Sequence, residues 1–276
     1  MKLLLAKIIG FFINLIAYIS PNYAARLAIN LFSTPKKGKL TEEALDFLDT
    51  AFQEEVNCNN QCIMTYRWLG EKQTILLAHG WESNSFRWKN LILTLKSQGY
   101  NVVALDAPAH GKSQGKTFNA IDYAECIHAV IKKFKPHTVI AHSVGGMATI
   151  LCQYKYQLNY LKNIVLLGAP SNFKDIFTRY TDMMSYNKSL IESINNFVLQ
   201  EFGHLPEYYD TAKFSSEIDL NGLIIHDEKD AIIPFKDALD YKANLVNSNL
   251  IVTQNLNHGL KSEEVNTHIL EFISDQ

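Results

Sequence analysis

Residues Thr138–Ile150 read TVIAHSVGGMATI and contain the most informative motif of this 276-residue chain. Its first three residues suit a β-strand, and the residues after Gly146 suit a buried helix. Ser143 therefore stands at the tip of a tight turn between a strand and a helix. In the nucleophile-elbow motif such a turn holds the serine oxygen clear of the sheet. The next backbone N–H and the helix N-terminus then face the position where an oxyanion would form.

The pattern here is A-x-S-x-G rather than G-x-S-x-G, because Ala141 replaces the first glycine. Small residues are needed beside the serine, since the turn and the neighbouring strands approach closely, and alanine is small enough. Ordinary strand-to-helix turns also produce five-residue matches of this kind. The rest of the chain has to distinguish a nucleophile from an ordinary turn.

The composition is that of a globular protein with a large core, since 47% of the residues are apolar and 20% are charged. A net charge of −2 gives no electrostatic basis for a nucleic-acid partner. Cys58 and Cys62 have a spacing that suits a disulfide or half of a metal site, but no second Cys/His pair accompanies them. We therefore expect free thiols, no metal and a cytoplasmic protein.

Residues 3–19 are strongly apolar and match the shortest length that spans a bilayer, although they include two polar residues. Four polar or small residues recur at helical spacing and form one stripe on this predicted helix. They are Lys7, Gly10, Asn14 and Ala17. A stripe of this kind favours an interfacial or docked helix over one surrounded by lipid.

A second apolar helix is predicted after Ser20-Pro21, which suit an N-cap and a first helical residue. Residues 1–40 are thus predicted to form a hydrophobic helical extension, distinct from a domain at 41–276. Two interpretations stay open: a helical hairpin packed on the domain or on another subunit, and a membrane-surface anchor. Membrane contact or self-association would involve residues 1–33. A transmembrane span is a third interpretation, and a secretory signal is disfavoured because Lys7 interrupts the apolar region.

Beyond the turn-rich linker at 34–39, residues 41–56 show an apolar helical face and are predicted to pack as a helix. From Cys62 onward, short β-rich runs alternate with helical runs. Strands are predicted at 63–68, 74–78, 102–105, 138–141, 164–167, 223–225 and 250–253, and helices at 86–97, 120–133 and 262–274. This alternation predicts an α/β fold with a mostly parallel sheet covered on both faces. Chemistry in such sheets gathers beyond the carboxyl ends of the strands, where Ser143 lies.

Unusual residues follow four other predicted strands. The segments are His79-Gly80-Trp81-Glu82, DAPAHGKS at 106–113, HDEKD at 226–230 with Ile233-Pro234 behind it, and Asn257-His258-Gly259. Each alone suits a tight bend or a surface histidine. Together with Ser143 they place serine, aspartate and histidine at strand ends in the chain order of one known hydrolase fold.

With these motifs the sequence resembles the α/β-hydrolase superfamily, in the lid-bearing branch of serine esterases and lipases. The resemblance covers roughly residues 63–273. It implies an α/β-hydrolase fold: a mostly parallel sheet flanked by helices, a helical lid inserted at about 170–219, and the N-terminal extension outside it. The motifs are specific for the fold and poorly specific for the substrate.

The chemistry of acyl transfer assigns roles to the motif residues. Serine is a poor nucleophile unless a base removes its proton, so Ser143 would be the nucleophile and His258 its base. An acid would orient the imidazole, and two candidates follow the same strand. The resemblance favours Asp230, which precedes Pro234, but Asp227 stays open.

The oxyanion hole would use the backbone N–H groups of Trp81 and Val144. His79 and His142 are expected to shape loops or to line the pocket. Inside the insertion, Phe173, Phe177 and Tyr180 share a helical face, which predicts a lid over an apolar pocket.

Two classes of function remain at this point. The first is a serine hydrolase that cleaves an apolar carboxylic ester or thioester through an acyl-enzyme, without a cofactor. The second is a non-catalytic, hydrolase-like protein that binds a small molecule or regulates a partner. Related dehalogenases and epoxide hydrolases carry aspartate at the position of Ser143, so alkyl-enzyme chemistry is disfavoured. The sequence identifies neither the acyl group nor the leaving group.

Overall fold

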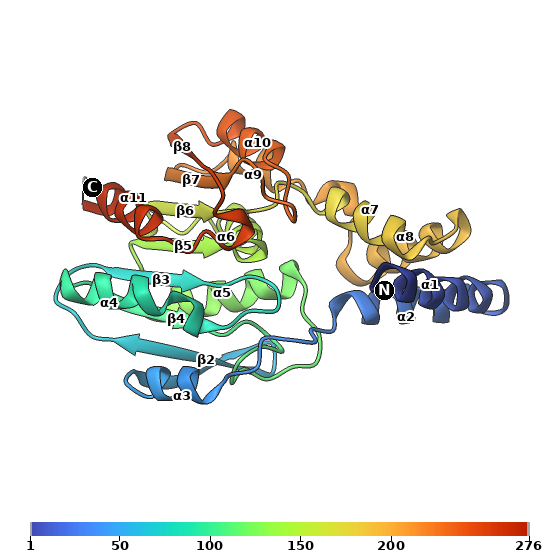
Figure 1. Cartoon of the computed structure of the whole chain (residues 1–276), viewed down its shortest axis with the longest axis horizontal. Coiled ribbons are helices and arrows are strands. Elements are labelled where there is room, and N and C mark those ends of the chain that lie inside the picture. Colours follow the sequence, from blue (N-terminus) through green and yellow to red (C-terminus); the bar gives the residue numbers. More distant parts are fainter. Residues whose placement is uncertain (1, 275–276) are drawn as a thin grey trace. The chain divides into compact units, whose positions relative to one another are not determined.

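The computed structural model in Figure 1 describes residues 2–274 of the chain and divides it into two compact units. The larger unit comprises Pro35–Ser171 and Thr211–Gln276 and contains the sheet. The smaller unit comprises Met1–Thr34 and Asn172–Asp210 and is built from helices.

The larger unit is organised on an eight-stranded sheet with the order β1-β2-β4-β3-β5-β6-β7-β8. Its strands are β1 (Phe52–Cys58), β2 (Gln61–Trp68), β3 (Thr74–Ala78), β4 (Asn101–Leu105), β5 (Thr138–His142), β6 (Asn163–Leu167), β7 (Asn221–Asp227) and β8 (Ser248–Thr253). Strand β2 pairs antiparallel with β1 and β4, and all other neighbours are parallel. The predicted mostly parallel sheet is confirmed.

Alternate residues of each central strand enter two different cores, as the period of two in a strand requires. In β5, for example, Val139 and Ala141 pack in one core while Ile140 packs in the other. The first core includes side chains of α5 (Ala120–Phe134), α6 (Val144–Tyr156), α9 (Thr211–Ser215) and α10 (Lys236–Asn244). The second includes side chains of α3 (Glu42–Leu48), α4 (Lys89–Ser97) and α11 (Glu263–Ser274). Helices therefore cover both faces of the sheet (Figure 1).

The prediction of a helix at 41–56 is wrong for its second half. Helix α3 ends at Leu48, and Phe52–Cys58 instead form the edge strand β1, paired residue by residue with β2. The two strands are joined by Asn59 and Asn60, which both have positive φ (47° and 62°). Asparagine tolerates this conformation, which two-residue hairpin turns of type I′ require.

The smaller unit combines helices from two distant parts of the chain. These are α1 (Lys2–Ile19), α2 (Pro21–Ser33), α7 (Phe173–Met184) and α8 (Lys188–Phe202). Their buried side chains form one cluster, which includes Ala28 of α2 and Leu190 of α8. The extension predicted at 1–40 and the insertion predicted at about 170–219 are separate features of the sequence, whereas their helices pack together in one unit of the structure (Figure 1).

Close contacts fix α1 against the end of α7. A Cβ atom on Gly10 would lie 1.7 Å from the carbonyl oxygen of Met184, so only glycine permits this approach. Asn14 donates to the carbonyl of Ser185 (2.9 Å) and accepts from the N–H of Asn187 (2.9 Å). Between residues 2 and 274, no helix combines the length and the apolar character needed to cross a bilayer.

Candidate active site

Ser143 lies between β5 and α6 with φ 53° and ψ −129°, a backbone conformation that non-glycine residues seldom adopt. Its N–H is bonded to the carbonyl of Leu167 on β6 (2.9 Å), which helps to hold the turn in place. Glycine is needed two residues later, because a Cβ on Gly145 would come within 2.6 Å of the carbonyl oxygens of Ala78 and His79. The predicted strand, turn and helix around Ser143 are all present.

A continuous hydrogen-bonded chain runs from Ser143 through His258 to Asp230. The Ser143 Oγ lies 2.9 Å from the Nε2 of His258, whose Nδ1 lies 2.7 Å from the Oδ2 of Asp230. His258 belongs to the short helical turn Asn257–Gly259 before α11, and Asp230 follows β7. The structure thus brings together three residues that follow three different strands, with Ser143 and His258 115 positions apart in the chain.

Asp230 is held by groups that favour its ionised form. Its Oδ1 accepts hydrogen bonds from the N–H groups of Ile232 (2.8 Å) and Ile233 (3.0 Å), which leaves Oδ2 for His258. Burial acts to raise the pKa of Asp230, but the hydrogen bonds from His258 and the two amides outweigh it and lower the pKa below its ordinary value. The Asp230 carboxylate therefore faces the imidazole in its charged form at neutral pH.

Asp227 has different partners. Its Oδ1 accepts from the N–H of Lys229 (3.1 Å), and its Oδ2 accepts from the Thr253 hydroxyl (3.2 Å) and the Leu256 N–H (2.7 Å). These bonds tie the end of β7 to the end of β8. Of the two aspartates left open by the sequence, Asp230 is the one bonded to His258.

The amides expected to bind an oxyanion follow two of the strand ends. Val144 is the first residue of α6, and Trp81 follows Gly80, where a Cβ would lie 2.7 Å from the Ser143 Cβ. Among the hydrogen bonds recorded for residues 2–274, neither amide donates to a protein acceptor. Both N–H groups are therefore free to donate to a substrate oxygen.

Arg87, which the sequence analysis did not single out, is linked to the histidine loop. Its Nη1 donates to the Nδ1 of His142 (2.7 Å), and its Nη2 donates to the carbonyl of Gly259 (3.1 Å). The Nε2 of His142 lies 2.8 Å from the carbonyl of His258. Burial keeps the pKa of His142 well below its ordinary value, and the electrostatic effects of Arg87 and of His258 lower it further. The ring is therefore neutral, and its proton is on Nε2 because Nδ1 accepts from Arg87.

His142 and Arg87 thus hold the two successive carbonyl groups that follow the His258 Cα. No feature of the sequence reveals this role, because Arg87 lies in an ordinary amphipathic segment more than 50 residues from His142. The contact exists only because the loop after β3 and the loop before α11 meet beside Ser143.

His79 is fully buried, and both of its ring nitrogens are occupied by the backbone. Its Nδ1 lies 2.7 Å from the carbonyl of Gly80, and its Nε2 accepts from the N–H of Ala107 (2.9 Å). This geometry joins the loop after β3 to the loop after β4. Its side chain has no exposed surface with which to contact a ligand.

Phe173, Phe177 and Tyr180 lie on α7 in the smaller unit, where they pack against Phe32 of α2. The hydroxyl of Tyr180 donates to the carbonyl of Ala28 (2.7 Å). The helical face foreseen for these residues is present, and within its own unit it packs against α2. A role in substrate binding remains a prediction for all three.

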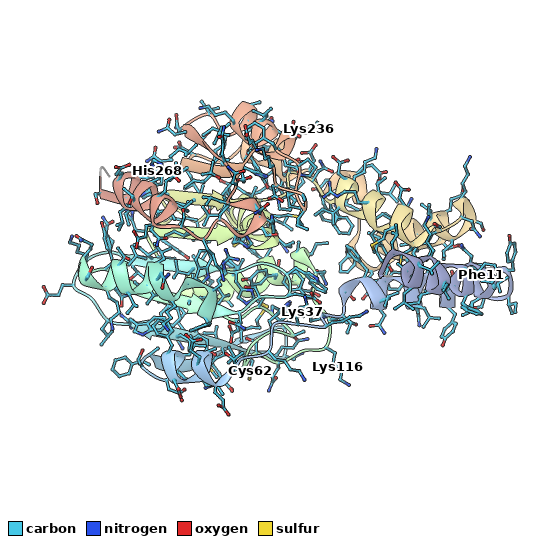
Figure 2. The ribbon with its side chains drawn as sticks, in the orientation of Figure 1. Phe11, Lys37, Cys62, Lys116, Lys236 and His268 are labelled. Atoms are coloured by element: carbon cyan, nitrogen blue, oxygen red, sulfur yellow. The ribbon has the colours of Figure 1, made fainter. Side chains whose placement is uncertain are left out.

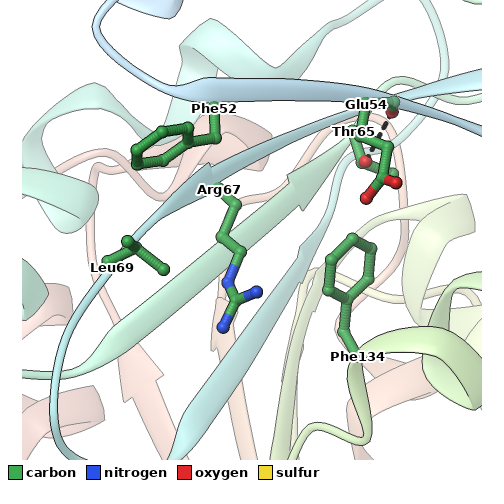
Figure 3. Close-up of a pocket in the computed structure, with 6 residues that line it drawn as sticks. All are labelled: Phe52, Glu54, Thr65, Arg67, Leu69 and Phe134. Atoms are coloured by element: carbon green, nitrogen blue, oxygen red, sulfur yellow. Dashed lines mark hydrogen bonds between the residues drawn. The ribbon is translucent and has the colours of Figure 1, made fainter.

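A shallow pocket of about 270 Å³ lies at the β1 edge of the sheet, on β1, β2 and the end of α5 (Figure 3). Its lining residues are Phe52, Glu54, Thr65, Arg67, Leu69 and Phe134. None of them contacts Ser143, His258 or Asp230. Within residues 2–274, no cluster of three or more His, Cys, Asp or Glu side chains could hold a metal ion.

Known proteins share this fold at low sequence identity. The profile of the family described as serine aminopeptidase, S33, matches residues 70–202. A putative lipase of Acinetobacter baumannii superposes with a TM-score of 0.65 at 17% identity, covering 85% of this chain and 94% of the lipase. An esterase of Exiguobacterium antarcticum gives 0.62 at 18% identity, with 81% and 98% covered. The chain belongs to the α/β-hydrolase superfamily.

Relatives of this α/β-hydrolase have diverse named activities. A non-heme haloperoxidase of Rhodococcus erythropolis is 25% identical over 259 residues, which cover 75% of this chain and 94% of that protein. A bifunctional esterase/perhydrolase of Acinetobacter calcoaceticus is 24% identical, with 72% and 91% covered. The predicted superfamily is confirmed, while the placement of the insertion as a lid over Ser143 remains a prediction.

Proposed function

We propose that the protein is a serine hydrolase that cleaves carboxylic esters or thioesters through an acyl-enzyme intermediate. The observation that carries the proposal is the hydrogen-bonded chain from Ser143 through His258 to Asp230. A serine hydroxyl gains nucleophilicity when an oriented imidazole accepts its proton, and each atom needed for that transfer is within hydrogen-bond distance.

In the first half-reaction the Oγ of Ser143 attacks the carbonyl carbon, while its proton moves to the Nε2 of His258. The carbonyl oxygen becomes negative and accepts hydrogen bonds from the amides of Val144 and Trp81. The tetrahedral intermediate collapses as the C–O or C–S bond breaks, and the imidazolium gives its proton to the leaving alcohol or thiol.

In the second half-reaction a water molecule attacks the acyl-serine. His258 removes the proton from the water and returns it to the Oγ of Ser143, which frees the carboxylic acid. Asp230 keeps the Nδ1 of His258 protonated and stabilises the imidazolium in both halves. Arg87 and His142 hold the histidine loop at the distance that these transfers need.

The named activities of the relatives agree with an ester substrate, since one is an esterase/perhydrolase and a structural neighbour is an esterase. The alternative is a hydrolase-like protein that keeps these residues but only binds a small molecule. The two differ in one respect: only an enzyme needs Ser143 to react much faster than any other serine.

A fluorophosphonate probe tests this difference on the whole chain. We expect one labelled site, which peptide mapping places on Ser143, together with hydrolysis of some member of a panel of p-nitrophenyl esters and thioesters of graded chain length. Ser143→Ala is expected to abolish both, and His258→Ala to abolish nearly all of both. Ser215→Ala is a matched control, because Ser215 is fully buried in α9 and bonds only to the carbonyl of Ala212.

Folded protein that takes no label and hydrolyses no member of the panel would contradict the proposal and favour the binding protein. Labelling spread over several serines, unchanged by Ser143→Ala, would have the same meaning.

A further inference from the structure

Helix α1 presents an apolar face that no described residue of its own unit covers. The outer face of α1, as we define it, consists of Leu4, Ile8, Phe11, Phe12, Leu15 and Tyr18, whose side chains are between 45% and 80% exposed. At about 100° per residue these positions fall within an arc of roughly 120°. Phe11 on α1 is labelled in Figure 2, where the side chains of this helix are drawn.

The opposite side of α1 is the one that packs. Gly10, Ile13 and Ala17 are buried there, and Asn14 bonds to the turn between α7 and α8. The packed side of the helix thus combines small and polar residues with isoleucines such as Ile13, whereas its aromatic and leucine side chains face outward. A helix of a soluble unit normally has the reverse orientation, because burial of the larger side chains is more favourable.

The outer face is large for an exposed surface. Phe11, Phe12 and Tyr18 are between 58% and 80% exposed and, at roughly 150–250 Å² for each full aromatic side chain, alone present about 300–500 Å². The aliphatic side chains of the face, with Leu5 and Ile19 at its border, add to this area. The largest apolar patch of an ordinary monomer is about 300–600 Å² and often marks a binding site. An area of this size suits either a second copy of the chain or a lipid surface.

The charges around the outer face favour a lipid surface. Lys7 borders the arc, Arg26 is exposed on α2, and neither helix contains Asp or Glu. Two copies meeting through this face would bring cations together without carboxylates from these helices, whereas anionic headgroups would neutralise them.

Tyr18 and Tyr23 add to this interpretation. Both are exposed at the end of α1 and the start of α2, and both combine an apolar ring with a hydroxyl. Such side chains are enriched at the boundary between headgroups and acyl chains. We propose that the outer face of α1 binds the surface of an anionic lipid bilayer, with the helix lying in the interface rather than crossing it.

Flotation of the full chain with vesicles tests the proposal. We use phosphatidylcholine vesicles with and without phosphatidylglycerol, and expect tighter binding to the anionic ones. The double variant Phe11→Gln/Phe12→Gln is expected to bind both kinds at least about tenfold more weakly, because it removes the apolar insertion. Lys7→Gln/Arg26→Gln is expected to weaken binding to anionic vesicles alone, by about fivefold for each cation removed.

The matched control is Leu93→Gln/Val246→Gln, which removes two exposed apolar side chains from the larger unit. Its binding is expected to be unchanged. Retained fluorophosphonate labelling and an unchanged helical circular dichroism signal show that each variant is folded. These readouts keep the lipid question separate from the enzymatic one.

Absence of binding by the wild-type chain to anionic vesicles would overturn the proposal, as would equal binding by the Phe11/Phe12 variant. Light scattering without lipid provides a further check, for which we expect a monomer. A dimer that the Phe11/Phe12 variant dissociates, with no vesicle binding, would identify a second copy as the true partner and overturn the lipid assignment.

Discussion

Replacement of Asp230 by asparagine tests the proposed acid, because the structure limits how the amide can be oriented. The Oδ1 of Asp230 accepts from the N–H groups of Ile232 and Ile233, and its Oδ2 accepts from the Nδ1 of His258. An asparagine that keeps both backbone bonds must point its NH₂ group at Nδ1. The ring would then carry its proton on Nε2, where it cannot accept the proton of Ser143.

The opposite orientation of the amide would preserve the working tautomer at the expense of the two backbone bonds. Leaving the buried amide of Ile233 without an acceptor costs about 1–3 kcal/mol, and loss of the bond from the more exposed Ile232 adds to this cost, which keeps this orientation to a small fraction of the molecules. The catalytic rate constant is therefore expected to fall about 10²–10⁴-fold in Asp230→Asn, close to the effect of the same change in other serine triads.

Asp227→Asn is the matched control, since it makes the same chemical change three residues away. Its partners are Lys229, Thr253 and Leu256, none of which contacts His258. We expect a loss of about 1–3 kcal/mol in the free energy of unfolding, with kcat within about tenfold of the wild type. Steady-state hydrolysis of the best ester in the panel measures kcat, and urea denaturation measures stability.

A larger kcat loss in Asp227→Asn than in Asp230→Asn would refute the assignment of the acid. A loss of less than about tenfold in folded Asp230→Asn would refute the orientation of the amide derived from the two backbone bonds.

Three further outcomes follow from the contacts described above. Arg87→Met removes the bond to the Gly259 carbonyl and the donor that orients His142, so kcat is expected to fall about 10–100-fold with KM changed less. An unchanged kcat would show that the loop is held in place without Arg87. Gly10→Ala places a Cβ in collision with the Met184 carbonyl and should lower the free energy of unfolding by about 1–3 kcal/mol. Ile8→Ala on the outer face should lower it by about 0.5 kcal/mol or less, and urea denaturation measures both. Because the folded-state pKa of Asp230 lies below its ordinary value of 3.8, its ionisation stabilises the protein above that pH, and this contribution disappears as the pH falls through the folded-state pKa. The difference in stability between wild type and Asp230→Asn should therefore shrink below about pH 4, and a constant difference down to pH 2 would contradict the lowered pKa.

The parallel strands could be predicted from the sequence because each is a short, buried apolar run bounded by turn residues. For Thr74–Ala78 the predicted limits and those of β3 are the same. The edge strand Phe52–Cys58 was missed, since spacings of three and four residues fit a helical face even where a strand forms. The adjacent pair Asn59-Asn60 was the available signal, because two positive φ angles favour a hairpin.

Ser143, Asp230 and His258 could be predicted as candidate site residues from their positions after strands, but the hydrogen bonds between them could not be predicted. Asp227 and Asp230 follow the same strand, and the choice between them depends on which carboxylate faces a loop almost thirty residues further on. Arg87 illustrates the stronger limit. Its partners belong to two other loops, so only the folded chain shows what it does.

The N-terminal helices show how a pattern can identify a face without identifying its partner. Three members of the predicted stripe, Gly10, Asn14 and Ala17, do face protein. Gly10 and Asn14 meet the end of α7 and the turn before α8, more than 150 residues away. Removal of residues 1–40 would therefore uncover the apolar side of α7 and α8. For this reason point changes on the outer face of α1 separate lipid binding from folding, whereas truncation would alter both. A bilayer that held α1 would also hold the insertion, because both belong to one packed unit.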